Sequence, residues 1–245
     1  MFRRALTSVV ASALPAALII ACGGNSQRAA LPPEPTGPNT ITSEERRDGW
    51  KLLFDGNSTT GWHSYKQATA VGWAAQNGEL YHTTGGADLV SDQQYDSFEL
   101  QLDWKVATGG NSGIFWWANE GTAEIYENAP EMQILDNTGH PDGKSPMTAA
   151  GSLYGLYPTQ IALAKPVGEW NHARLIVKGS KVEQWLNGVK VVTADFDSKE
   201  MKDKIASTKF KAWPTFGKSR RGHIGLQFHG TPIWFRNIVI KEYVR

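Results

Sequence analysis

Short runs in which apolar and polar residues alternate, separated by turn-forming residues, recur from Trp50 to the C-terminus. This period of two predicts β-strands, because successive side chains of a strand point to opposite faces of its sheet. Asn77-Gly78 and Asn187-Gly188 are strong hairpin signals between such runs. We predict about a dozen strands, at Lys51–Phe54, Trp73–Gln76, Glu79–Thr83, Asp88–Ser91, Phe98–Val106, Ser112–Ala118, Glu131–Leu135, Asn171–Lys178, Lys181–Leu186, Val189–Ala194, Gly222–Phe228 and Trp234–Val244.

Helical patterns are short and few. We expect a helical turn at Glu44–Arg47 and a short helix at Ser198–Ala206 with Asp197 as its N-cap. Because no strand–helix–strand alternation accompanies the strands, neighbouring strands are expected to pair antiparallel. The pattern therefore predicts an all-β fold, a two-sheet antiparallel β-sandwich. Thr138–Lys165 follows neither period, and a loop of this length in a compact domain is usually functional or mobile.

The first residues of the chain have the character of a targeting segment. Arg3 and Arg4 precede the apolar run Ala5–Ile20, which is too short for a stable membrane span and is interrupted by Pro15. The run leads into Ile19-Ile20-Ala21-Cys22, which resembles a bacterial lipobox with Cys22 as the lipidated residue. An ordinary secretory signal cleaved nearby is the alternative.

Cys22 is the only cysteine, so the chain forms no internal disulfide, and its position supports lipidation. We predict a signal peptide over residues 1–21, a Pro-rich tether over residues 22–45 and one β-sandwich domain over residues 46–245. The protein is then exported and lipid-anchored in the bacterial cell envelope, facing the periplasm or the surface. By resemblance to lipoproteins of double-membraned bacteria, Gly23 after the cysteine favours the outer membrane.

Charge and tryptophan content narrow the choice of partners. The chain has 25 Lys and Arg against 24 Asp and Glu, a net charge of +1, and no basic stripe stands out, so nucleic acid is not an expected partner. Ten tryptophans suit either a β-sheet core or platforms on which sugar rings stack. The core is the commoner place for any single tryptophan.

Two predicted strands carry polar side chains on one face. Glu131 and Gln133 alternate with apolar residues, and Gln227 and His229 do so with His223 in the run near the C-terminus. Two such polar faces indicate a groove lined by polar side chains, although the solvated face of an edge strand would show the same pattern. Arg236 would supply a cation to this groove, although structural ion pairing is the commoner role of such a residue.

No metal site is predicted. His82, His140 and His172 lack the spacing of known zinc motifs, and the aspartates lack the spacing of an EF-hand loop. We therefore predict no cofactor, while a structural or catalytic divalent ion stays open. The sequence does not indicate an oligomeric state.

Six motifs follow one another in the chain: Trp50-Lys51-Leu52-Leu53-Phe54-Asp55-Gly56 with Gly61-Trp62, Gly109-Gly110-Asn111-Ser112-Gly113-Ile114-Phe115, Glu131-Met132-Gln133-Ile134-Leu135-Asp136-Asn137, Trp170-Asn171-His172-Ala173-Arg174, Trp185-Leu186-Asn187-Gly188-Val189, and Gly222-His223-Ile224-Gly225-Leu226-Gln227 with Trp234-Phe235-Arg236-Asn237-Ile238. Together and in this order they resemble the 3-keto-disaccharide hydrolase family. The resemblance covers Asp48 to Val244 and implies a jelly-roll fold of the concanavalin A-like lectin and glucanase type.

The resemblance implies an enzyme that cleaves 3-keto-glycosides. A keto group on carbon 3 acidifies the hydrogen on carbon 2, so a base can remove that proton, the aglycone can leave carbon 1, and water can add. We assign the base to Glu131 or His229 and stabilisation of the enolate oxygen to Arg236 or Gln133. The expected carbohydrate contacts are Trp116 as a stacking wall, with Asn111, Asp136 and Gln227 as further substrate-binding residues.

Two other functions compete with this one. An ordinary retaining glucanase needs two carboxyl groups about 5–5.5 Å apart, whereas the run Glu131, Gln133, Leu135 offers one, and Asp136 points to the opposite face. A non-catalytic carbohydrate-binding module would use the same groove without turnover. The sequence leaves open the sugar, the linkage, the anomer and the choice between hydrolase and lyase.

Overall fold

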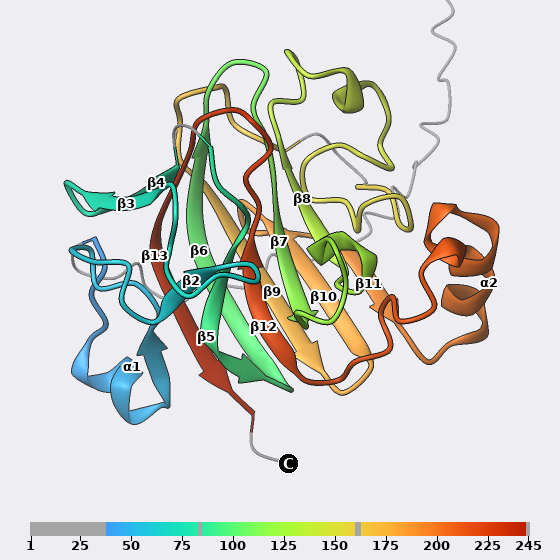
Figure 1. The fold of residues 1–245 in the computed structure, drawn as a ribbon, viewed down its shortest axis with the longest axis horizontal. Helices are drawn as coiled ribbons and strands as arrows, with labels where there is room; N and C mark the ends of the chain where they lie inside the picture. The colour runs from blue at the N-terminus through green and yellow to red at the C-terminus, as the bar shows by residue number, and fades with distance from the viewer. Residues whose placement is uncertain (1–37, 83–84, 160–162, 244–245) are drawn as a thin grey trace, which may run out of the picture.

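The protein is a sandwich of two antiparallel sheets (Figure 1). The computed structural model describes residues 38–82, 85–159 and 163–243. Sheet A has the strand order β11 (Val189–Asp195), β10 (Lys181–Leu186), β9 (Asn171–Lys178), β6 (Phe98–Val106), β13 (Ile233–Glu242), β4 (Glu79–His82) and β3 (Trp73–Gln76), and β1 (Trp50–Leu52) also pairs with β13. Sheet B has the order β2 (Trp62–Ser64), β5 (Leu89–Tyr95), β12 (Gly222–Leu226), β7 (Asn111–Ala118) and β8 (Glu131–Leu135).

The core between the sheets is rich in aromatic side chains. Trp104 of sheet A and Trp116 and Trp117 of sheet B are at most 1% exposed. Burying a large apolar side chain contributes roughly 1.5–3 kcal/mol, so the tryptophans account for much of the burial that holds the sheets together. The predicted all-β antiparallel sandwich is confirmed.

Most strands lie where the alternation predicted them, and five have the predicted bounds. Both Asn-Gly pairs turn with positive φ at each residue, 54° and 77° at Asn77-Gly78 and 48° and 82° at Asn187-Gly188, as two-residue hairpins require. The strand that the pattern missed is β2, which has three residues, too few to show a period.

The helical elements are short: α1 (Ser43–Arg47), α2 (Lys199–Ser207) and the 3₁₀ turns η1 (Ile125–Glu127), η2 (Pro141–Lys144) and η3 (Lys209–Ala212). The N-cap of α2 is Ser198, whose hydroxyl accepts from the Met201 N–H at 3.1 Å, and not the predicted Asp197. Asp197 instead accepts from the Arg220 guanidinium at 2.7 Å. Within the described ranges, no helix is both long and apolar enough to span a bilayer.

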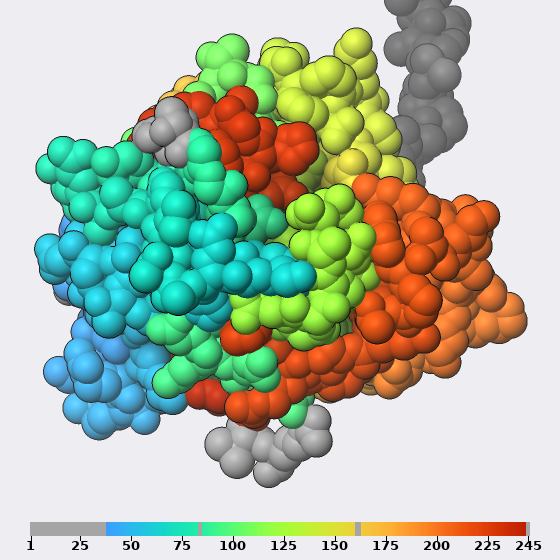
Figure 2. Space-filling view, in the orientation of Figure 1, coloured from blue at the N-terminus to red at the C-terminus, as the bar shows by residue number. Residues whose placement is uncertain are grey.

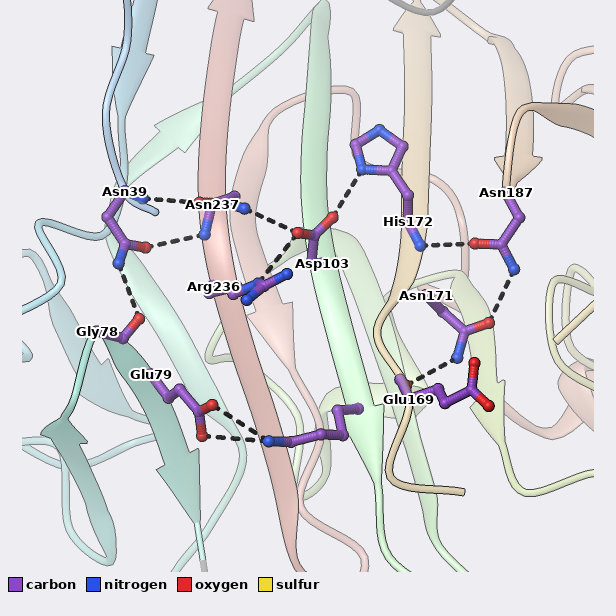
Figure 3. A network of polar contacts seen from close by, with 11 residues as sticks. Asn39, Gly78, Glu79, Asp103, Glu169, Asn171, His172, Asn187, Arg236 and Asn237 are labelled. Carbon is purple, nitrogen blue, oxygen red and sulfur yellow. Dashed lines mark hydrogen bonds and ion pairs between the residues drawn. The ribbon is translucent and has the colours of Figure 1, made fainter. Parts of the chain in front are cut away.

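The folded domain includes residues that we assigned to the tether. Asn39 donates its backbone N–H to Asn237 Oδ1 at 2.7 Å and its side-chain amide to the Gly78 carbonyl at 2.8 Å (Figure 3). Asn237 returns a backbone hydrogen bond to Asn39 Oδ1 at 2.9 Å. Attachment to sheet A therefore begins by Asn39, ahead of the predicted boundary at residue 46. The predicted signal peptide and Cys22 lie outside the described residues.

Candidate active site

The register of sheet B gathers polar side chains on its outer face, away from the core. Phe115 pairs with Glu131, and Gly113 pairs with Gln133. The Gln227 N–H donates to the Gly113 carbonyl at 2.9 Å, which places Gln227 next to Gly113 on the other side. Because alternate residues share a face, Glu131, Gln133 and Gln227 come together around Gly113.

The space above Gly113 holds the carboxyl group of Glu131. A Cβ atom on Gly113 would lie 2.7 Å from the Glu131 carboxyl carbon, a contact that no real side chain makes. Glu131 is 9% exposed. Burial, with the negative charges of Asp88 and Asp142, raises the pKa of Glu131 to about 8, although the Lys209 cation opposes the shift. Glu131 is therefore a carboxyl group poised to exchange a proton near neutral pH.

Asp88 is a second carboxyl group on this side of the molecule. It precedes β5, and its Oδ1 accepts from the Phe228 N–H at 2.9 Å. Burial, helped by the charge of Glu124, raises the pKa of Asp88 to about 7, while the Phe228 hydrogen bond opposes the rise. Asp88 stands at the start of a predicted strand, and we assigned it no functional role from the sequence. The available signal was its position next to a polar-faced strand, but only the β5–β12 pairing brings it to the site.

The long loop after β8 forms one border of the site. It continues sheet B, because Gln133 N–H donates to the Ser152 carbonyl at 3.0 Å and Tyr154 N–H to the Glu131 carbonyl at 3.0 Å. The Tyr154 hydroxyl lies 3.4 Å from Asp142 Oδ2. Lys209 Nζ lies 4.5 Å from the centre of the Tyr154 ring, so η3 reaches this border from the other side. No local pattern around Lys209 indicated that it is a site residue.

The connection between β7 and β8 covers the neighbouring part of the same face. A small second cluster of buried apolar residues lies beneath it, formed by Tyr65, Val90, Phe115, Ala118, Ile125 and Ala129. The Tyr65 hydroxyl fixes the connection by donating to the Asn119 carbonyl at 2.7 Å. Figure 2 shows this face bordered by that connection (light green), the loop after β8 (yellow-green) and the 199–221 segment (orange). Glu131 therefore lies between this apolar cluster and the polar side chains of Gln133 and Gln227.

Two amides on this face have polar atoms to offer a ligand. Gln133 is 1% exposed, and neither its Oε1 nor its Nε2 has a hydrogen-bond partner among the described residues. The buried Oδ1 of Asn111 likewise has none within the part of the chain that the structure describes. Buried polar groups are normally paired, so these atoms are candidate contacts for a bound hydroxyl group.

Trp116 is not a surface for sugar stacking. It is 0% exposed and belongs to the core between the sheets, where its ring contacts Phe196. The β7–β8 register explains the correction, since Glu131 lies opposite Phe115 and not beside Trp116 on one face. A strand pairing shifted by one residue exchanges the two faces.

Asp136 has a structural environment. Its Oδ2 accepts from the Gly109 N–H at 2.8 Å and its Oδ1 from the Thr138 N–H at 3.0 Å. Burial raises the pKa of Asp136, but these bonds and another from the Gly139 N–H outweigh that effect and lower the pKa. Both carboxylate oxygens therefore hold the turn that follows β8, and we leave Asp136 out of the binding residues.

Arg236 lies in the other sheet, on the outer face of sheet A (Figure 3). Its Nε is 3.2 Å from Asp103 Oδ2, and its guanidinium carbon lies 4.2 Å from the centre of the Trp170 ring. Asp103 also lies 2.9 Å from the Nδ1 of His172. The core separates this network from Glu131, so the expectation that Arg236 faces the same groove is corrected.

His229 lies in the connection between β12 and β13 and is exposed. It stays a candidate base, because it follows Gln227 by two residues in the chain. Among the described residues, no group of three or more His, Cys, Asp or Glu is arranged to hold a metal ion.

Comparison with known proteins places the chain in a family. Residues 49–241 match the family model described as a 3-keto-alpha-glucoside-1,2-lyase-like domain. A 3-keto-disaccharide hydrolase of Bacteroides thetaiotaomicron is 31% identical over 280 residues, covering 95% of this chain and 97% of the relative.

Two crystal structures of putative glycosyl hydrolases from Parabacteroides distasonis share the fold. One has a TM-score of 0.81 at 30% identity and covers 85% of this chain and 100% of that chain. The other has a TM-score of 0.65 at 29% identity and covers 79% of this chain and 99% of that chain. The family model matches most of the chain and the relative is 31% identical over 95% of it, so the chain belongs to the 3-keto-α-glucoside-1,2-lyase-like family.

Proposed function

We propose that the protein cleaves 3-keto-glycosides on the outer face of sheet B, with Glu131 as the base that removes the proton from carbon 2. The observation that carries this proposal is the Glu131 carboxyl group, buried over Gly113 with its pKa raised to about 8. A general base is most effective when its pKa is close to the working pH.

Family membership makes the chain a hydrolase of glycosidic bonds. The 3-keto substrate is the finer part of the proposal. It is supported by the name of the Bacteroides relative, a 3-keto-disaccharide hydrolase, and by the description of the matching family, a 3-keto-alpha-glucoside-1,2-lyase-like domain.

The reaction runs in two halves. Glu131 takes the proton from carbon 2, and the C–H electron pair forms the C2–C3 double bond of an enolate as the carbonyl oxygen becomes negative. The enolate then reforms the carbonyl, a double bond forms between carbons 1 and 2, and the aglycone oxygen leaves carbon 1 and takes a proton. Addition of water at carbon 1, with return of a proton to carbon 2, completes a hydrolysis. Release before addition gives the lyase product.

The neighbouring groups have matching roles. Asp88, whose pKa is raised to about 7, holds a proton in a large share of molecules at neutral pH and would donate it to the leaving oxygen. The Lys209 charge acts on Glu131 and would also favour negative charge on the enolate oxygen. Gln133, Asn111 and Gln227 would contact substrate hydroxyls, and the unpaired Gln133 amide would also donate to the enolate.

The first experiment compares a 3-keto-α-glucoside with its unoxidised parent, with and without a chelator. Cleavage of the keto form alone, with a primary isotope effect when carbon 2 carries deuterium, supports the proposal. Cleavage of the parent sugar would instead support an ordinary glycosidase that uses Glu131 and Asp88 as its two carboxyl groups. Binding without turnover would indicate a carbohydrate-binding module. Product analysis in H₂¹⁸O separates hydrolase from lyase.

We also propose that Cys22 anchors the protein to a bacterial membrane through a lipid, which rests on the lipobox resemblance. Labelling of cells with a radioactive fatty acid tests this proposal. Wild type is expected to incorporate the label, and Cys22→Ser is expected to lose it. Label retained by Cys22→Ser would rule out lipidation at this cysteine.

A further inference from the structure

A cavity of about 530 Å³ lies between α2, η3 and the segment that leads into β12. Its lining includes the half-buried Trp213 together with Phe210 and Phe216, which are at most 4% exposed, belong to the core and stack with ring centroids 4.1 Å apart. Trp213 is therefore the ring among these three that a ligand can reach, and such a ring suits a flat ligand or the apolar face of a sugar.

The charge around this cavity is strongly one-sided. Residues 199–221 contain eight Lys or Arg and two acidic residues, a net charge of +6, whereas the whole chain carries +1. The cavity-lining Lys202, Lys211 and Lys218 are exposed, and none has an ion-pair partner within the described ranges. Asp197, the acidic residue of the lining, is already paired with Arg220 at 2.7 Å. A negatively charged ligand would therefore be favoured here.

The 3₁₀ turn η3 connects the cavity to the residues around Glu131. Lys209 of η3 contacts the Tyr154 ring and acts on Glu131, while the next two residues, Phe210 and Lys211, line the cavity. Trp213 packs against Tyr126 of η1 at 5.4 Å, on the border of the same face. Figure 2 shows the 199–221 segment (orange) directly against the connection that carries η1 (light green).

From this arrangement we infer that the cavity is the binding site for the leaving group and that it favours 3-keto-glycosides whose aglycone is a ring bearing an anionic group. This inference rests on the proposed function, because it extends that site by one subsite. The half-buried Trp213 stacks on the ring, and the unpaired lysines receive the charge.

The test compares two matched aglycones, the 4-carboxyphenyl and 4-carbamoylphenyl 3-keto-α-glucosides, which differ in charge and little in size. Wild type is expected to show a higher kcat/KM for the carboxylate. Lys211→Glu is expected to reduce the ratio of the two values by about fivefold, the order of one partly exposed ion pair. Lys199→Glu is the control, since Lys199 lies on α2 outside the cavity lining. Equal kcat/KM values in wild type, or a ratio unchanged by Lys211→Glu, would overturn the inference.

Failure of the proposed function is visible separately, as cleavage of neither 3-keto-glucoside. In that case, calorimetric titration with the unoxidised 4-carboxyphenyl and 4-carbamoylphenyl glucosides decides the inference. Preference for the acid that is lost in Lys211→Glu and kept in Lys199→Glu supports an anion-favouring cavity. Equal binding of the two glucosides overturns it.

Discussion

The absence of a side chain at Gly113 makes room for the carboxyl group of Glu131. The two residues lie on adjacent strands, two register positions apart, because Glu131 pairs with Phe115 and Gly113 with Gln133. The Glu131 side chain therefore runs diagonally across the sheet and ends over a glycine. Gly113 does not need its glycine for backbone conformation, since its φ is not positive. The close approach of the carboxyl group is the reason that glycine fits here.

Gly113→Ala is expected to displace the Glu131 carboxyl group and to lower kcat by about 100-fold, since a shift of about 1 Å in a catalytic group has an effect of this size. The fold should persist, with overpacking costing about 1–3 kcal/mol. Steady-state kinetics and urea unfolding check both parts. Gly121→Ala is the matched control, because Gly121 also has an ordinary φ but lies in an exposed turn. Unchanged kcat in Gly113→Ala would show that the Glu131 position is not catalytic.

Glu131→Gln keeps the shape of the side chain and removes its ability to accept a proton. We expect kcat to fall by at least about 1,000-fold, while substrate binding is retained, because loss of a general base removes a contribution of about 10²–10⁴. Activity on the 3-keto substrate and titration calorimetry measure the two effects. Glu242→Gln, a change at an exposed ion pair with Lys51, should leave kcat unchanged. If Glu131→Gln turns over at the wild-type rate, the base is another group, and His229 becomes the next candidate.

The buried carboxyl groups make stability depend on pH in a defined direction. The folded-state pKa values of Glu131 and Asp88 are raised from 4.5 and 3.8 to about 8 and about 7. Between these limits the folded protein binds more protons than the unfolded chain, so stability falls as pH rises, by at most about 1.4 kcal/mol per pH unit for each group. Urea unfolding from pH 5 to 9 measures the slope. Glu131→Gln should reduce it and should be more stable than wild type above pH 8; the same slope in both proteins would contradict the burial of Glu131.

Much of the fold was predictable because its signals are local. Alternation fixed strands such as Phe98–Val106, and the two Asn-Gly turns have the positive φ values that their residue types favour. The assignment of Glu131 and Gln133 to one face also needed only the period of a strand. These features depend on residues close together in the chain.

The rest of the site depends on strand pairing, which the sequence does not specify. Trp116 appeared beside Glu131 only under a register shifted by one position, and Arg236 appeared to share its groove only if β13 belonged to sheet B. Asp88 and Lys209 reach Glu131 from segments that are distant in sequence. Each of these relations forms between elements and not within one, so periodicity carries no information about it.

Lys209→Gln tests whether the cation at η3 tunes the base. The Lys209 charge lowers the pKa of Glu131, so its removal should raise that pKa further. The active form has Glu131 deprotonated and Asp88 protonated, and Glu131 has the higher pKa, so the Glu131 pKa sets the pH above which kcat/KM falls. We expect this falling limb of kcat/KM to move to higher pH by roughly half to one pH unit. Lys211→Gln, two residues further along η3, is the control and should leave the limb in place when the substrate is uncharged. If the limb moves to lower pH, or does not move, in Lys209→Gln, the Lys209 charge does not set the pKa of the base.

Asp136→Asn should affect the fold and not the chemistry. The carboxylate holds the turn after β8 through the N–H groups of Gly109 and Thr138, and an amide has one acceptor oxygen in place of two. We expect the free energy of unfolding at pH 7 to fall by about 1–2 kcal/mol, in the range of a hydrogen bond to a charged group, while kcat of the folded enzyme is retained.

Because the pKa of Asp136 is lowered, its contribution is complete above pH 3.8 and is lost as pH falls through the folded-state pKa. The difference between variant and wild type should therefore shrink in acid. Asp203→Asn, at an exposed pair with Lys199, is the control and should change stability by less than about 0.5 kcal/mol. A loss of kcat in Asp136→Asn without a loss of stability would return Asp136 to the substrate-binding residues.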